Sequence, residues 1–317
     1  MPATMTGAMH VMAGVLIDDA GRVLLAQRPP GKHLAGLWEF PGGKLEADEA
    51  PVDGLVRELR EELGIEATVG EPLIRVPWRY GERFLLLDAR IVRAWRGQPL
   101  PLDGQALQWC DPQSIDPALL APADRHILCA LQLPARYHIT EDVPADQQDA
   151  WRLRLIDAMA AGARMVLLRF PHWPASDVRE LAAALLPEAR CQGAHLLLSG
   201  DIEGALALGD GMGVQLKSAQ LSTLTSRPLP VSQWVGASCH DESDLRQAAD
   251  IADFATLSPV ARTATHPDAQ PLGWDRFQRM VEPAVIPVYA LGGMARDDVA
   301  KARQTGGQGV AGIRGFW

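Results

Sequence analysis

Apolar residues recur at helical spacing in a stretch between Pro51 and Leu63. They lie three and four positions apart, which is typical of a helix that buries one face. These residues are Val52, Leu55, Val56, Leu59 and Leu63. Proline suits the first helical position, and Gly64 can end the helix in a left-handed conformation. The pattern therefore predicts a helix over residues 51–63.

The rest of the first part of the chain alternates apolar runs with turn residues. The runs are His10–Ile17, Arg22–Gln27, Leu37–Phe40, Glu71–Arg79, Arg83–Trp95 and Gln105–Cys110. The turn residues Asp18 to Gly21 separate the first two runs, so we expect those two to form a hairpin. A second helix is predicted over Ala123–Leu133. This order of elements predicts an α/β/α sandwich with a mixed sheet.

After Leu133 the pattern changes to short apolar runs that alternate with helical segments. Eight runs are expected to be strands: Tyr137–Thr140, Met165–Arg169, His195–Leu198, Gly213–Leu216, Trp234–Ser238, Phe254–Leu257, Ile286–Leu291 and Gly309–Ile313. Helices are predicted over Trp151–Ala161, Asp177–Ala189, Asp244–Ile251 and Arg296–Thr305. Strands and helices that alternate in this way predict a compact (β/α)8 barrel. We therefore expect two domains, residues 1–133 and residues 136–317.

The composition limits the classes of partner. The chain has 317 residues, 47% of them apolar and 22% charged, and a formal net charge of −9. This acidic balance argues against a nucleic-acid polymer as partner, because such a partner needs a basic surface. The four cysteines lack the spacing of a zinc site, so reduced thiols and a cytoplasmic location are expected. Since we find neither a basic signal segment nor an apolar run of membrane-spanning length, we expect no membrane partner.

Three glutamates on the predicted helix 51–63 indicate chemistry. Glu58, Glu61 and Glu62 stand at i, i+3 and i+4, so their carboxylates share one surface. Like charges one turn apart, near the negative end of the helix dipole, are unfavourable unless they serve a function. The alternative is a solvated charged face on which Arg57 pairs with Glu61. A cluster of hard oxygen ligands instead suits a divalent cation, most simply Mg2+, which also binds phosphate oxygens.

The spacing from Gly43 to Ile65 resembles the Nudix box at every defined position. It reads Gly, five residues, Glu, seven residues, Arg-Glu-Leu, one residue, Glu-Glu, one residue, Gly-Ile. The resemblance implies a hydrolase of nucleoside diphosphates linked to another group. It implies that Mg2+, or Mn2+ in its place, is held by Gly42 (through its backbone carbonyl), Glu58, Glu61 and Glu62. The catalytic residues that it implies are Arg57, Glu58, Glu61 and Asp103, with Arg57 orienting a glutamate.

Residues 8 to 132 are similar, more narrowly, to the MutT branch of this family, which hydrolyses oxidised dGTP. Arg28, twelve residues before Phe40, and the lead-in Leu37-Trp38-Glu39-Phe40-Pro41-Gly42-Gly43 carry the similarity. It implies a nucleotide pocket formed by Arg28, His33, Glu39, Phe40, Pro41, Gly42 and Asp124. Taken singly, Phe40 is more typical of a core residue and Arg28 of a surface cation.

Two positions depart from the MutT pattern. Asp103 stands where that branch has a loop glutamate, and Asp124 stands where it has a base-reading asparagine. An ionised Asp124 can accept a hydrogen bond from a purine N–H, whereas it can donate one only when it is protonated. We predict an Mg2+-dependent hydrolase that converts 8-oxo-dGTP to 8-oxo-dGMP and pyrophosphate, with a carboxylate of the helix or Asp103 as the base.

The second half resembles thiamine-phosphate synthase and its TenI-like relatives. The segments RYHITED, AGARMVLLR, DIEGALALGDGMGVQL, SPVARTATHPDAQPLGW and VYALGGMARDDV carry this resemblance. It suggests a phosphate site after the last two strands, where barrels commonly bind phosphate, although glycines there can also serve tight turns alone. The residues of this expected site are Gly292, Gly293, Arg314 and Gly315.

The barrel departs from the synthases at their catalytic positions. Gly200 and Gln220 replace the metal-binding aspartates, and His266 replaces a loop lysine. The synthases bind diphosphate through a Gln-x-Arg-x-Lys motif, and the matching positions in this chain are Leu167, Arg169 and Pro171. We therefore predict a barrel without synthase activity, which either binds a phosphorylated ligand or only supports the first domain. Thiamine-pathway diphosphates remain the alternative substrates of the hydrolase, because the two halves are fused.

Overall fold

The computed structural model describes residues 9–263 and 270–317, so His266 lies outside the described residues. The chain divides after Gln132 into two compact units, each described here by itself. No helix of the described residues is long and apolar enough to cross a membrane.

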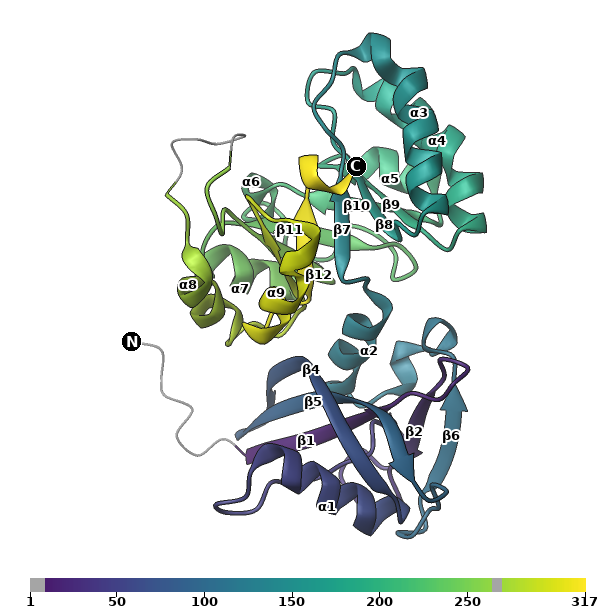
Figure 1. The fold of residues 1–317 in the computed structure, drawn as a ribbon, viewed down its shortest axis with the longest axis vertical. Coiled ribbons are helices and arrows are strands. Elements are labelled where there is room, and N and C mark those ends of the chain that lie inside the picture. Colours follow the sequence, from purple (N-terminus) through teal and green to yellow (C-terminus); the bar gives the residue numbers. More distant parts are fainter. Residues whose placement is uncertain (1–8, 264–269) are drawn as a thin grey trace. The chain divides into compact units, whose positions relative to one another are not determined.

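The described residues of the first unit form strands, two α-helices and two short 3-10 turns (Figure 1). Its strands are β1 (Met9–Leu16), β2 (Val23–Gln27), β3 (Trp38–Glu39), β4 (Glu66–Tyr80), β5 (Arg83–Arg96) and β6 (Ala106–Cys110). Its α-helices are α1 (Pro51–Leu63) and α2 (Asp124–Gln132), and its 3-10 turns are η1 (Pro112–Ser114) and η2 (Pro117–Leu119). Helices α1 and α2 cover opposite faces of the sheet that contains β1, β5 and β4, as the α/β/α prediction requires.

The pairing of these strands differs from the predicted hairpin. Strand β1 pairs in parallel with β5, which pairs antiparallel with β4, and this gives the predicted mixed sheet. Strand β2 instead pairs antiparallel with β3 and β6 in another sheet. Between β1 and β2, the isolated bridge of Ile17 with Val23 and the hydrogen bond from the Asp18 N–H to the Arg22 carbonyl oxygen close the turn. The hairpin prediction is therefore wrong beyond its turn, because both strands pair with segments much later in the chain.

Helix α1 begins and ends where the sequence predicts. Pro51 occupies its first turn, and Gly64 ends it with φ 68° while donating its N–H to the Arg60 carbonyl oxygen. Leu55, Leu59 and Leu63 are fully buried and pack with residues of β1 and β5. Val52 is 40% exposed, so the buried stripe is narrower than the periodicity suggests. The packed stripe fixes the rotation of α1, and thereby the face on which its glutamates stand.

The described residues of the second unit form a closed barrel of eight parallel strands, as predicted. Its strands are β7 (Arg136–Ile139), β8 (Met165–Leu168), β9 (His195–Ser199), β10 (Met212–Leu216), β11 (Val235–Cys239), β12 (Phe254–Leu257), β13 (Val288–Leu291) and β14 (Gly309–Gly312). Its helices are α3 (Gln148–Ala160), α4 (Ala175–Cys191), α5 (Ile202–Leu208), α6 (Ser218–Leu221), α7 (Glu242–Ile251), α8 (Gly273–Val281) and α9 (Val299–Gln304), with 3-10 turns η3 (Ala145–Gln147), η4 (Arg296–Asp298) and η5 (Arg314–Phe316).

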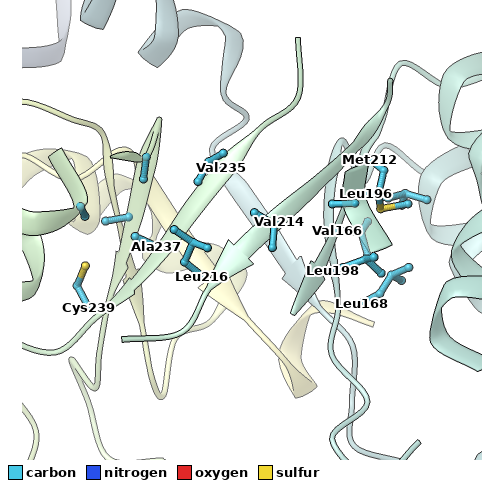
Figure 2. Close-up of a cluster of buried hydrophobic side chains, with 14 of the residues drawn as sticks. Val166, Leu168, Leu196, Leu198, Met212, Val214, Leu216, Val235, Ala237 and Cys239 are labelled. Carbon is cyan, nitrogen blue, oxygen red and sulfur yellow. The ribbon is translucent and has the colours of Figure 1, made fainter. Parts of the chain in front are cut away.

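Alternate residues of the barrel strands serve two different cores. Figure 2 shows side chains of the apolar cluster between strands and helices, among them Val166, Leu168, Leu196 and Leu198. Their neighbours in sequence point inward, where large aromatic side chains meet small residues. Phe254 leaves no room for a Cβ atom at Gly236, which would lie 2.7 Å from the Phe254 ring. The barrel is therefore a filled core that opens at the carboxyl ends of its strands.

Candidate active site

A cavity of about 1050 Å3 in the first unit gathers most of the predicted site residues. The predicted residues that line it are Arg28, His33, Glu39, Gly42, Glu58, Glu61, Glu62, Asp103 and Asp124. They come from the end of β2, the loop around β3, helix α1, the loop before β6 and the start of α2. The fold thus brings an acidic helix face and a buried aspartate to one cavity.

Two consecutive glycines let the loop before helix α1 lie close to that helix on one side and to β1 on the other. A Cβ atom on Gly43 would lie 2.2 Å from a carboxylate oxygen of Glu58, and one on Gly42 would lie 2.2 Å from the Met12 carbonyl oxygen. Gly43 and Pro41 accept hydrogen bonds from Met12 and Gly14, which ties the loop to β1. Within the described residues the Gly42 carbonyl receives no hydrogen bond, so its oxygen is available as a ligand.

Arg57 organises the carboxylates of α1 that face the cavity. Its guanidinium makes two hydrogen bonds of 3.0 Å to Glu49, which stands just before the helix. It also donates to Glu58 at 2.9 Å and to Glu61 at 3.1 Å. The predicted Arg57–Glu61 pair is therefore present, as one part of a larger network around the arginine.

Glu62 lies near three other carboxylates of the cavity. Burial raises its pKa to about 7, a hydrogen bond of 3.2 Å from the Gly42 N–H opposes that rise, and the nearby Glu39, Glu58 and Asp103 add to it. A cation that offset the charge of these four carboxylates would stabilise the ionised form of Glu62.

The oxygen donors of this cavity fit a hard divalent cation in their chemistry. Carboxylates and a backbone carbonyl are the ligands that Mg2+ and Mn2+ prefer. Among the described residues, however, no three His, Cys, Asp or Glu side chains stand together in a ready metal site. Glu58 and Glu61 are turned toward Arg57 instead, so the donors must reorient if they are to share one ion.

Asp124 closes the other end of the cavity. It is the first residue of α2, is 6% exposed, and accepts a hydrogen bond of 2.9 Å from the Phe40 N–H. Burial raises its pKa to about 7; the Phe40 N–H opposes this, and the Glu39 carboxylate adds to it. Asp124 therefore titrates near neutrality, which suits a group that both donates and accepts hydrogen bonds.

The Phe40 side chain takes a different place from the one expected, whereas Pro41 is expected to contribute its main chain only. Phe40 is 3% exposed, and neither side chain lines the cavity. The contribution of Phe40 is its backbone N–H, which holds Asp124. Its ring packs in the core, which is the reading that Phe40 alone would favour.

Arg28, His33 and Glu39 form one group on the cavity wall. Arg28 pairs with the Glu39 carboxylate and donates to the His33 carbonyl oxygen at 2.6 Å. Burial raises the pKa of Glu39, and the Arg28 guanidinium opposes that rise. Asp103 is half-exposed and lies 3.9 Å from the Lys32 ammonium, an ion pair of little stability at the surface.

Tyr80 also lines the cavity, although the sequence analysis does not name it. Its ring meets His33 edge-on, with centroids 5.3 Å apart, and its hydroxyl oxygen accepts a 3.4 Å hydrogen bond from the Ala123 N–H. The aromatic ring therefore stands beside Asp124 on the cavity wall. The turn between β4 and β5 also brings Arg83 and Phe84 to the cavity.

The barrel has its own cavity, of about 450 Å3, at the carboxyl ends of its strands. Of the four residues expected to bind phosphate there, Gly292 lines it, whereas Gly293, Arg314 and Gly315 do not. Gly293 packs against the loop before it, since a Cβ atom there would lie 2.5 Å from the Arg262 carbonyl oxygen. Arg169 and Lys217 are the charged side chains on the wall, beside His240.

Comparisons with known proteins match both units. A family model described as NUDIX domain matches residues 12–130, and one described as Thiamine monophosphate synthase matches residues 137–316.

Three relatives illustrate these matches. The CTP pyrophosphohydrolase of Escherichia coli (strain K12) is 46% identical over 120 residues, which cover 38% of this chain and 89% of that protein. The 8-oxo-dGTP diphosphatase of Proteus vulgaris is 42% identical over 90 residues, 28% of this chain and 80% of that protein. The thiamine-phosphate synthase of Chloroflexus aurantiacus (strain ATCC 29366 / DSM 635 / J-10-fl) is 28% identical over 178 residues, 56% of this chain and 82% of that protein.

Proposed function

The chain belongs to the Nudix hydrolases through its first unit and to the thiamine monophosphate synthase family through its second, and from this we propose that it hydrolyses oxidised purine nucleoside triphosphates. The proposed reaction converts 8-oxo-dGTP and water to 8-oxo-dGMP and pyrophosphate. One observation carries the proposal: the acidic face of α1 and the buried Asp124 line the same cavity. This cavity has room for a nucleotide that spans both ends.

The two ends of the cavity differ in chemistry. Glu58, Glu61, Glu62 and the Gly42 carbonyl would hold Mg2+, which when bound draws charge from the phosphate oxygens and orients water. Asp124 and Tyr80 lie where the base would be read and stacked. The triphosphate would therefore lie along α1 and the base against α2.

Each residue has a distinct part in the hydrolysis. Arg57 positions Glu58 and Glu61 through its hydrogen bonds to both. A carboxylate of α1 or Asp103 accepts the proton as the water oxygen attacks phosphorus. The bond that breaks is the bridging P–O bond, so pyrophosphate leaves and the nucleoside monophosphate remains.

CTP is a second candidate substrate. The relative that is 46% identical to the first unit is named for it. Asp124 also supports CTP, because a protonated carboxyl group matches the paired donor and acceptor on the cytosine edge.

Steady-state kinetics test both candidates and the thiamine alternative. We would compare kcat/KM for 8-oxo-dGTP, dGTP, CTP and thiamine diphosphate, with the full-length chain and Mg2+. A large preference for 8-oxo-dGTP over dGTP and CTP supports the proposal, whereas a preference for CTP replaces it with the second candidate. A preference for thiamine diphosphate overturns both candidates. It would indicate that the fusion to the barrel determines which substrate the hydrolase uses.

We further propose that the barrel does not catalyse the synthase reaction. Gly200 and Gln220 stand where the synthases carry metal-binding aspartates, and no carboxylate appears among the described residues that line the barrel cavity. Formation of thiamine phosphate by the purified chain would contradict this.

We place the hydrolase in the cytoplasm, with the nucleotide pool.

A further inference from the structure

The barrel cavity contains cations without the carboxylates that its family would use to hold a metal. Arg169 and Lys217 line the wall, together with hydroxyl groups and apolar side chains. In the described part of the chain, neither the Arg169 guanidinium nor the Lys217 ammonium group has a carboxylate within 4.0 Å. A positive wall of this kind favours an anion.

Lys217 lies over the two positions at which the synthases carry aspartates. A Cβ atom on Gly200 would lie 2.8 Å from Cε of Lys217 and 3.1 Å from the side-chain oxygen of Gln220. The ammonium nitrogen is the next atom beyond Cε. The stem of Lys217 therefore occupies the space that a side chain at residue 200 would need, and its ammonium group, one bond beyond Cε, lies near that position.

Hydrogen bonds fix this arrangement. Gln220 accepts from the Lys217 N–H at 2.9 Å and donates to the Gly200 carbonyl oxygen at 3.0 Å. The amide of Gln220 thus uses both of its polar atoms to close the loop around Gly200. A neutral amide and a glycine offer no anionic ligand, so these residues do not fit a divalent cation.

The acids on neighbouring loops are committed elsewhere. Asp201 follows Gly200 directly, but makes two hydrogen bonds of 2.6 Å to Arg179 and caps α5 through the Gly204 N–H. Asp244 accepts hydrogen bonds from the Ser218 hydroxyl and the His240 N–H. Neither side chain lines the cavity, which keeps its wall positive.

We propose that Lys217 takes the place of the divalent cation in this barrel, so that the cavity binds the phosphate or diphosphate group of a small molecule without a metal. Arg169, which also lines the cavity, supplies a second cation. Ile139, Leu167 and Leu291 supply apolar contacts for the rest of the ligand. This site is separate from the hydrolase cavity and does not depend on the nucleotide that is hydrolysed there.

Calorimetric titration of the full-length chain with inorganic phosphate and pyrophosphate, in EDTA, tests the proposal. Without divalent metal the carboxylates of the first unit repel these anions, so binding in EDTA reports on the barrel. For inorganic phosphate we expect one binding site. Its Kd should change less than about twofold when Mg2+ replaces EDTA, since an ammonium group needs no metal to bind an anion. Binding of neither anion in EDTA would overturn the proposal.

Matched variants assign the site. Lys217→Met keeps an apolar side chain over Gly200 but removes the charge, and should weaken anion binding about tenfold or more, the loss typical of a hydrogen bond to a charged group. Lys301→Met removes an exposed lysine of α9 that does not line the cavity, and should leave the Kd unchanged. Equal Kd values for Lys217→Met and the parent chain would contradict the proposal. Lys217→Ala, with thermal melting to check its fold, repeats the test with a shorter side chain.

Discussion

Asp124 is the residue whose charge state we expect to influence substrate choice. Burial raises its pKa from the ordinary 3.8 to about 7. The folded chain therefore keeps this proton between about pH 4 and pH 7, where the unfolded chain loses it, and the stability that Asp124 contributes falls as the pH rises through that window. Substrate binding should titrate near neutral pH, where cells work.

We predict that base preference changes with pH because of Asp124. An ionised carboxylate accepts from the two donors of a guanine edge, whereas a protonated one also donates to the ring nitrogen of cytosine. The ratio of kcat/KM for 8-oxo-dGTP to that for CTP should rise from about pH 6 to about pH 8. Asp124→Asn should flatten this profile, since an amide does not titrate. A constant ratio in the parent chain would remove Asp124 from base recognition.

Tyr80 gives a second prediction about the base. Stacking of a base on an aromatic ring contributes about 1–3 kcal/mol, so Tyr80→Ala should raise KM about tenfold and change kcat little. Tyr80→Phe should behave like the parent chain, because the hydroxyl makes one long hydrogen bond of 3.4 Å. A fall in kcat at unchanged KM would instead place Tyr80 among the residues that act on the phosphates.

The residues of the proposed site differ in how well the amino-acid sequence alone identifies them. Glu58, Glu61 and Glu62 are close in sequence, so helical spacing alone gathers them on one face. Tyr80 lies more than forty positions before Asp124, and the two meet because β4 crosses the sheet face that α2 covers. The burial that raises the pKa of Asp124 likewise depends on packing between distant segments, which no local pattern contains.

At the scale of elements, α1 carries the acidic face that we propose holds the metal, and one substitution can test that proposal. Glu61→Gln keeps the shape of the side chain but removes its charge and one contact of Arg57. We expect the fold to persist and Mg2+-dependent kcat to fall about a hundredfold. Asp53→Asn, an exposed charge removal on the same helix, is the control and should retain activity. Comparable turnover in the two variants would contradict the assignment of Glu61 to the metal site.

The elements also show where local patterns stop being informative. Helix α1 is predicted to the residue because Pro51 and Gly64 act locally at its two ends. The pairing of β1 and β2 is not, because hydrogen-bond partners are chosen across the whole sheet. The sequence pattern does not indicate helices α5 and α6, because they are short, 7 and 4 residues, and offer little periodicity.

At the scale of the molecule, each unit has a hydrophobic core of its own. The core around α1 draws on residues of the first unit, and the cluster between the barrel strands and helices draws on residues of the second. All the residues that line the hydrolase cavity precede Gln132. The proposed hydrolase site therefore belongs to one unit and the proposed anion site to the other.

We predict that residues 1–132 alone retain the hydrolase. A unit with its own core and a complete cavity should fold by itself, so kcat/KM for the preferred nucleotide should stay within about twofold of the full-length value. The matched control is Glu61→Gln in the truncated chain, whose loss should equal that in the full-length chain. If the truncated chain keeps a cooperative thermal transition but loses turnover, the barrel contributes to the hydrolase site. A selective loss toward thiamine diphosphate would instead mean that the barrel supplies or senses that substrate, and would restore the reading in which the fusion serves thiamine chemistry.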